Sequence, residues 1–161
     1  MERQLTSKDT VSLVLWILII QLISFATGML TQDQIPNWYS ELIKPDLTPP
    51  SIVFPIVWTL LYIMIALAGW WLWKHHDQPQ AKTAFSFFML QLIMNWLWTP
   101  IFFYWHLVGM ALLWIVVLIG VTGSVIYLSL SNYRFSAYML IPYFLWLCFA
   151  AYLNASIWYL N

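Results

Sequence analysis

The sequence predicts an all-α integral membrane protein, folded as a bundle of five transmembrane helices. Apolar residues make up 63% of the chain and charged residues only 7%, whereas soluble domains carry about 45–50% and about 25%. Five apolar runs have the length of about 20 residues that a helix needs to cross a hydrocarbon core about 30 Å thick. Helices are favoured over a β-barrel because barrel strands alternate in segments of about 10 residues, and no such segments are seen here.

We expect the spans, in chain order, at residues 11–31, 52–73, 83–105, 107–131 and 135–160, so that residues 1–161 form a single transmembrane domain. The first run follows Arg3 and Lys8, as a signal peptide would. Its apolar stretch is longer than the roughly 7–15 residues of a signal-peptide core, so we expect it to remain in the mature protein.

The second, third and fifth spans carry aromatic and uncharged polar residues at helical spacing. Residues three or four apart lie on one helix face, and these faces are expected to look inward and to line a shared cavity. A cavity of aromatic rings with a few amides suits a flat, largely apolar ligand. The faces are Trp58, Tyr62 and Ala66 in the second span, Gln91, Asn95, Trp98 and Phe102 in the third, and Pro142, Trp146, Ala150 and Asn154 in the fifth.

Other residues of the spans have expected structural roles. In the fourth span Gly120, Gly123 and Ser124 allow a helix to approach closely, either within the bundle or from a second copy. Pro100 and Pro142 lack a backbone donor and are expected to kink their spans. Tryptophans near the span ends are expected at the membrane interface: Trp16, Trp70, Trp71, Trp73, Trp105 and Trp158.

Charged residues are confined to the connections and the span ends, and this excludes several classes of function. Ion-coupled carriers and pumps usually hold ionisable groups at membrane depth, but all six acids and all six bases lie elsewhere. His75, His76 and His106 lack the spacing of a metal site, and Cys148 is the single cysteine. The net charge is zero. We therefore expect no metal site, no required cofactor and no nucleic-acid partner.

The basic residues predict the orientation in the lipid bilayer. Lys44 stands alone on one side, and the other five bases fall on the side of the N-terminus: Arg3, Lys8, Lys74, Lys82 and Arg134. Basic residues are retained on the cytoplasmic side. We therefore expect a bacterial inner-membrane protein with a cytoplasmic N-terminus, and with the first connection, residues 32–51, on the far side. The mitochondrial outer membrane is the alternative location.

Four blocks of residues identify a family resemblance. They are Trp38-Tyr39-x-x-Leu42-x-Lys44-Pro45-x-x-x-Pro49-Pro50, Val57-Trp58-x-x-Leu61-Tyr62, Gln91-x-x-x-Asn95-Trp96-x-Trp98-x-Pro100-Ile101-Phe102-Phe103, and Pro142-Tyr143-x-x-Trp146-x-x-x-Ala150-x-x-Leu153-Asn154. In this order they resemble the TspO/MBR family, the tryptophan-rich sensory proteins, also called the translocator protein or peripheral benzodiazepine receptor family. The resemblance covers most of the chain.

The resemblance implies a five-helix bundle that forms a homodimer and binds tetrapyrroles such as protoporphyrin IX or haem, sterols such as cholesterol, and synthetic benzodiazepine-type ligands. It implies a membrane receptor, sensor or transporter-like protein. One alternative is an enzyme that degrades porphyrin in a light-dependent reaction. Another is a membrane scaffold regulated by its ligand.

The resemblance also implies site residues. Residues 32–51 would form a lid over the ligand, and Trp58 and Trp146 would be catalytic only if the protein is an enzyme. The lid residues would be Lys44, Pro45, Pro49 and Pro50. The ligand-binding residues would be Trp38, Trp58, Tyr62, Asn95, Trp98, Trp146, Ala150 and Leu153.

Three departures from the family pattern qualify these expectations. Leu47 replaces the aromatic residue usual between the lysine-proline pair and the double proline, so packing of the lid is expected to differ. Met110 and Trp114 stand where relatives often carry an aromatic residue and an acid, which puts affinity for synthetic drugs in doubt. No Lys or Arg follows Arg134, so the cholesterol motif proposed for the end of the fifth helix is absent.

Overall fold

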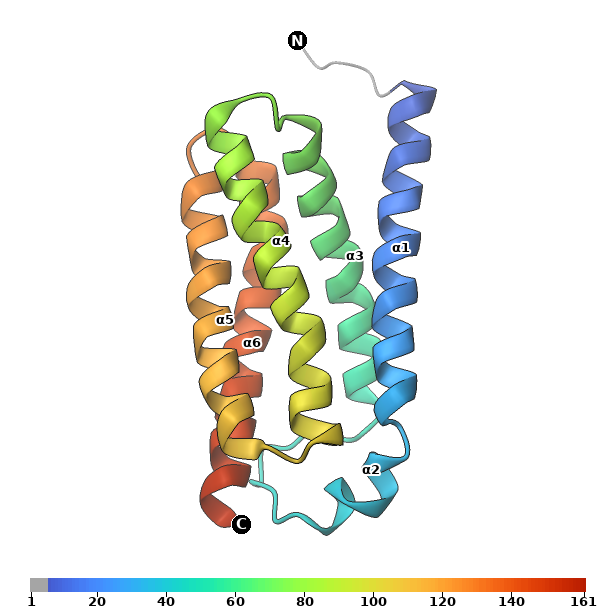
Figure 1. Cartoon of the computed structure of the whole chain (residues 1–161), viewed down its shortest axis with the longest axis vertical. Helices are drawn as coiled ribbons and strands as arrows, with labels where there is room; N and C mark the ends of the chain where they lie inside the picture. The colour runs from blue at the N-terminus through green and yellow to red at the C-terminus, as the bar shows by residue number, and fades with distance from the viewer. Residues whose placement is uncertain (1–5) are drawn as a thin grey trace.

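The computed structural model describes residues 6–161 and is a bundle of long helices (Figure 1). Each long helix is long and apolar enough to cross a membrane, with α4 continuing through the short helix η2 in its span. The predicted fold class, an all-α membrane bundle with five spans, is therefore confirmed. The long helices are α1 (Ser7–Thr31), α3 (Val53–Lys74), α4 (Pro79–Thr99), α5 (Val108–Ser129) and α6 (Arg134–Leu160). The short ones are α2 (Gln34–Asn37), η1 (Tyr39–Glu41) and η2 (Pro100–Tyr104).

Helices α3, α4, α5 and α6 enclose the core, and α1 lies at the edge of the bundle (Figure 1). Helix α5 packs against α4 and α6, and α3 packs against α6, α4 and α1. In α1 only Ile20 and Thr31 are buried. The rest of this helix exposes apolar side chains, which suit contact with lipid.

Polar contacts fasten α1 to α3 and α4. Trp70 Nε1 donates a hydrogen bond of 2.9 Å to Ser12 Oγ, and Trp96 Nε1 donates one of 3.1 Å to Ser24 Oγ. Gly69 lets α3 lie close to both α4 and α1. A Cβ atom at this position would lie 2.3 Å from the Phe88 ring of α4 and 2.9 Å from the Trp16 ring of α1. Trp70, expected at the membrane interface, is covered by α1 and is only 3% exposed.

Two helices begin before the residues predicted from hydrophobicity. Helix α1 starts at Ser7 because Thr6 and Asp9 form a capping box that satisfies backbone donors ahead of the apolar run. Asp9 also pairs with Lys74 at 2.8 Å. Helix α4 starts at Pro79, a residue whose fixed φ and missing donor suit the first helical turn.

The two prolines inside the spans behave differently. Helix α4 ends as an α-helix at Thr99, and the chain continues from Pro100 to Tyr104 as a π-helical segment, η2. Helix α6 continues as an α-helix past Pro142 without a change of helix type. Both prolines remove a backbone donor, but only Pro100 is accompanied by a change of helix type.

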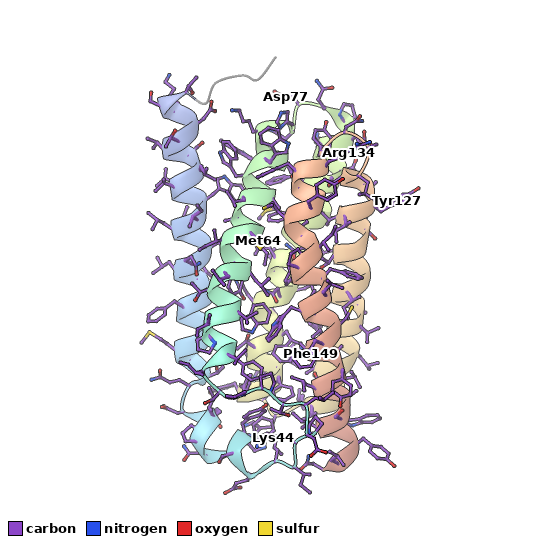
Figure 2. All side chains as sticks on the ribbon, turned by 180° about the vertical axis from the view of Figure 1, so that it is seen from behind. Lys44, Met64, Asp77, Tyr127, Arg134 and Phe149 are labelled. Atoms are coloured by element: carbon purple, nitrogen blue, oxygen red, sulfur yellow. The ribbon has the colours of Figure 1, made fainter. Side chains whose placement is uncertain are left out.

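The ends of the bundle differ in charge and in covering. Four bases lie at the end where α1 begins, and Arg3 lies outside the described residues; Figure 2 shows Arg134 at that end and Lys44 at the other. The lid, residues 32–51, folds across the end that carries Lys44 and contains α2 and η1 (Figure 1). The candidate site lies toward this covered end.

Candidate ligand-binding site

An aromatic cluster joins α3 and α6. The rings of Trp58 and Tyr62 are stacked with centroids 5.4 Å apart, and Trp58 meets Trp146 edge to face at 6.5 Å. The Phe54 ring lies 6.0 Å from the Trp146 ring, and the Tyr143 ring lies 6.5 Å from the Trp58 ring. These edge-to-face and stacked geometries are the ones that aromatic rings favour. The structure thus brings together three of the predicted site residues.

Asn95 connects α4 to this cluster. Its side chain is buried, and Nδ2 donates a hydrogen bond of 2.9 Å to the Tyr62 hydroxyl. Gln91, one turn earlier on the same face, is fully buried, and neither its amide nitrogen nor its amide oxygen has a partner. The predicted inward orientation of this face agrees with the position of both amides.

A second aromatic cluster joins the lid to α4 and η2. The Phe102 ring stacks on Trp98 at 5.1 Å and receives Trp38 of the lid edge to face at 5.6 Å. Tyr39 contacts Phe102 and Phe103 at 6.2 and 5.4 Å. Trp98 also packs against the buried core that α3, α4, α5 and α6 enclose.

The predicted faces of α3 and α6 meet ring to ring, and the face of α4 meets that of α3 through the bond from Asn95 to Tyr62. The two hollows that stand out among residues 6–161 are open depressions on the outer surface, and no predicted site residue lines either of them. One has a volume of about 480 Å³ and lies along α4 and α5 beside Gly120 and Gly123. An apolar void lacks partner atoms, so contact between the rings is the favourable arrangement when no ligand separates them.

Several polar atoms at these clusters are buried without a partner. They include the indole N–H groups of Trp98 and Trp146 and the side-chain oxygen of Asn154, whose Nδ2 donates to Val108 O at 2.9 Å. An unpaired buried donor costs about 1–3 kcal/mol. Two donors and one acceptor are therefore available to the polar groups of a ligand.

Ala150 and Leu153 form the wall on α6. Ala150 is half-buried and packs against the main core, and Leu153 is buried. Both side chains are small or aliphatic, so this wall offers apolar contact. It adds no group that takes part in proton transfer.

The predicted lid residues make local contacts, within the lid and at the start of α3. Lys44 Nζ donates to Ser40 O at 3.2 Å and to Leu42 O at 2.9 Å, and it lies 4.8 Å from the centroid of the Tyr39 ring. Pro45 starts a turn closed by a hydrogen bond of 2.9 Å from Thr48 N to Pro45 O. Pro49 follows this turn, and Pro50 O accepts a hydrogen bond of 2.9 Å from Val53 N at the start of α3.

Sequence reasoning missed the contacts that fasten the lid to the bundle. His106 stacks on Trp38 at 4.1 Å, and its Nε2 lies 3.0 Å from Gln34 Oε1. The side chain of Asn161 accepts from Ile43 N at 3.0 Å and donates to Ile43 O at 3.1 Å. His106 has φ 56°, a left-handed conformation that is uncommon outside glycine. No local pattern in the sequence indicates these pairings.

The side chains of the two clusters are aromatic or uncharged and polar. Within residues 6–161 no group of three or more His, Cys, Asp or Glu side chains is placed to hold a metal ion. The described carboxylates lie outside both aromatic clusters. What the clusters offer is stacking surface, indole donors and amide groups, and these recognise an apolar ring system with a few polar atoms.

Comparison with known proteins agrees with this architecture. The family model of the TspO/MBR family matches residues 16–160. Similar proteins include a tryptophan-rich protein TspO of Archaeoglobus fulgidus, which is 32% identical over 95% of this chain and 99% of that protein. A tryptophan-rich sensory protein of Cereibacter sphaeroides is 32% identical over 84% and 82% of the two chains. The translocator protein of Homo sapiens is 34% identical over 76% and 73%. The chain therefore belongs to the TspO/MBR family of integral membrane proteins.

Proposed function

We propose that this protein is a membrane receptor or transporter-like protein that binds tetrapyrroles, with protoporphyrin IX or haem as the ligand and sterols as a second class. The observation that carries the proposal is the pair of aromatic clusters under the lid, with indole N–H groups buried and unpaired. A porphyrin is a flat aromatic macrocycle with polar atoms at its centre and edge. Stacking surface with a few donors matches both properties.

The closed arrangement of the rings sets a condition on binding. A macrocycle fits between Trp58 and Trp146, or between Trp98 and Phe102, only when these rings separate, and the lid covers this end of the bundle. Once the rings have separated, each of them packs against the ligand in place of its neighbouring ring. We infer that ligand binding is coupled to movement of the lid.

The test is a titration of protoporphyrin IX into the purified protein in nonionic detergent, in the dark, following the porphyrin absorbance. Wild type is expected to bind saturably. Trp146→Phe keeps an aromatic ring but removes the indole donor, and it should weaken binding about five- to tenfold. Trp105→Phe, at a residue 55% exposed, is the matched control and should bind like wild type. Absence of saturable binding, or equal affinity of the two variants, would contradict the proposed site.

A second candidate function is light-dependent breakdown of the bound porphyrin. The observation that favours it is the direct contact of Trp58 with Trp146 at 6.5 Å, which would put two oxidisable indoles beside a bound macrocycle. Illumination of the complexes formed in the same titration separates the two functions. A protein-dependent product that disappears in Trp58→Phe supports the enzyme, and photobleaching at the rate of free porphyrin excludes it.

We further propose a homodimer in a bacterial inner membrane, with a cytoplasmic N-terminus. The charge asymmetry of the two ends supports the orientation. The family resemblance supports the dimer, and the groove along α4 and α5 beside Gly120 and Gly123 is a face on which a second copy could pack. The molecular mass of the protein in detergent, measured by light scattering, tests the dimer.

A further inference from the structure

We propose that Lys44 is the carboxylate receptor of this site and makes the protein select flat apolar ligands that carry an acidic group. This inference rests on the proposed function and deepens it. It concerns the difference between a tetrapyrrole with free propionate groups and a neutral ligand of the same shape. The argument starts from the charge of Lys44 and the groups that surround it.

Lys44 is the basic residue of the lid end. The other described bases, Lys8, Lys74, Lys82 and Arg134, belong to the opposite end of the bundle, and Figure 2 shows Arg134 and Lys44 far apart along its long axis. Apart from Lys44, no lysine or arginine among residues 6–161 is therefore close enough to meet an anionic ligand under the lid.

The contacts of the Lys44 ammonium are all uncharged. Two backbone carbonyls accept from Nζ, at 2.9 and 3.2 Å, and the ring face of Tyr39 lies 4.8 Å away. Burial raises the pKa of the Tyr39 phenol above its ordinary value, so this group remains neutral and does not act as a counter-ion. These contacts orient the ammonium group without neutralising its charge.

No described carboxylate pairs with Lys44. The lid contains Asp33, Glu41 and Asp46, but the ion pairs within residues 6–161 are Lys74 with Asp9 and His76 with Asp77, both at the opposite end. Lys44 is half-buried, and its contacts are to residues of the lid. A partly buried, oriented cation without an anionic partner is a favourable place for a ligand carboxylate.

The position of Lys44 connects this charge to the aromatic clusters. Its partner Tyr39 contacts Phe102 and Phe103, and Phe102 stacks on Trp98. A macrocycle inserted beside Trp98 would thus have its edge toward Tyr39 and Lys44. An acidic substituent on that edge could exchange the two carbonyl contacts of Nζ for a charge-assisted hydrogen bond, which is stronger.

The experiment compares two ligands with two proteins in nonionic detergent. Protoporphyrin IX carries two carboxylates, and its dimethyl ester has the same ring with neither. The proteins are wild type and Lys44→Gln. The quantity measured is the ratio of the two dissociation constants in each protein, because partition of either porphyrin into micelles is the same for both proteins and cancels in this cycle.

Wild type is expected to prefer the acid over the ester, and Lys44→Gln should lose about tenfold of that preference. Lys44→Arg keeps the positive charge and should retain the preference for the acid. That result would show that the charge of residue 44 is the property required. Lys82→Gln removes a base from the opposite end and should behave like wild type. Added salt should weaken binding of the acid only.

Two results would overturn the inference. One is an equal preference in wild type and Lys44→Gln. The other is loss of the preference when phosphatidylglycerol is added to the micelles, because Lys44 would then pair with a lipid phosphate. Either result leaves saturable porphyrin binding, and so the proposed function, intact. If neither porphyrin binds to wild type, the proposed function fails and this inference fails with it. A thermal melt of each variant confirms that it is folded.

Discussion

Gln91 and Asn95 lie on one face of α4 and show how a buried amide can raise or lower stability. Asn95 donates a hydrogen bond to the Tyr62 hydroxyl, whereas both amide atoms of Gln91 are buried without a partner. A hydrogen bond recovers the cost of burying a polar group, and an unpaired amide leaves that cost of about 1–3 kcal/mol in place. The two residues are therefore expected to contribute to stability with opposite sign.

Substitution of the two amides by apolar residues of similar size tests this difference. Gln91→Met should raise the melting temperature in detergent and Asn95→Leu should lower it, by about 2–4 °C per kcal/mol for a chain of this size. The measurement is thermal unfolding followed by circular dichroism. A lower melting temperature for Gln91→Met would show that a bound water or ligand satisfies the amide in solution.

The tryptophans show what residue patterns alone can and cannot predict. Spacing by four correctly indicates that Trp58 and Tyr62 share a face, and the structure adds that Trp146 meets them from α6. The place of Trp70 near a span end predicts the membrane interface, but α1 covers this residue, which is bonded to Ser12, 58 residues away in sequence. The helix that covers a given ring is determined by how the helices pack. The residue pattern of a single helix does not carry that information.

At the scale of elements, the lid is attached to the bundle at two separate places. Asn161, at the end of α6, holds the backbone of Ile43 through both of its side-chain atoms. His106, in the connection between η2 and α5, holds Gln34 and Trp38 at the other part of the lid. Ligand entry beneath the lid requires at least one attachment to open.

Removal of one attachment should therefore change the dynamics of the lid more than the stability of the bundle. Asn161→Ala removes two hydrogen bonds to Ile43, so amide hydrogen exchange at residues 42–44 should accelerate about tenfold. Association and dissociation of protoporphyrin IX should both become faster, with little change in melting temperature. The control is Asn132→Ala, which removes a hydrogen bond to Gln80 at the opposite end. Unchanged exchange at residues 42–44 would show that His106 alone holds the lid.

The spans are the most predictable elements, and the connections are the least. Long apolar runs determine where helices cross a bilayer, so each expected range overlaps a long helix. Hydrophobicity does not report a capping box such as Thr6 with Asp9, and α1 accordingly begins earlier than expected. The attachments of the lid join residues 72 and 118 positions apart. Such pairings follow from the assembled bundle, which explains why sequence reasoning missed them.

At the scale of the whole molecule, the two ends of the bundle have different chemistry. One end carries the described bases Lys8, Lys74, Lys82 and Arg134, each in the first or last turn of a long helix. The other end carries the lid and Lys44 (Figure 2), and the lid residues Trp38 and Tyr39 belong to the second aromatic cluster. An odd number of spans also places the start of α1 and the end of α6 at opposite ends of the bundle (Figure 1). The orientation in the membrane therefore decides from which compartment a ligand reaches the lid.

The charge asymmetry predicts that the lid faces away from the cytoplasm, because basic residues are retained on the cytoplasmic side during insertion. A Cys148→Ser background removes the native thiol, and Asp46→Cys in the lid and Asp77→Cys between α3 and α4 then report the two ends. In intact bacterial spheroplasts a membrane-impermeant maleimide should label Asp46→Cys, and it should label Asp77→Cys only after lysis. The reverse pattern would place the lid and its ligand entry in the cytoplasm. Labelling of both variants before lysis would mean that the chain inserts in both orientations.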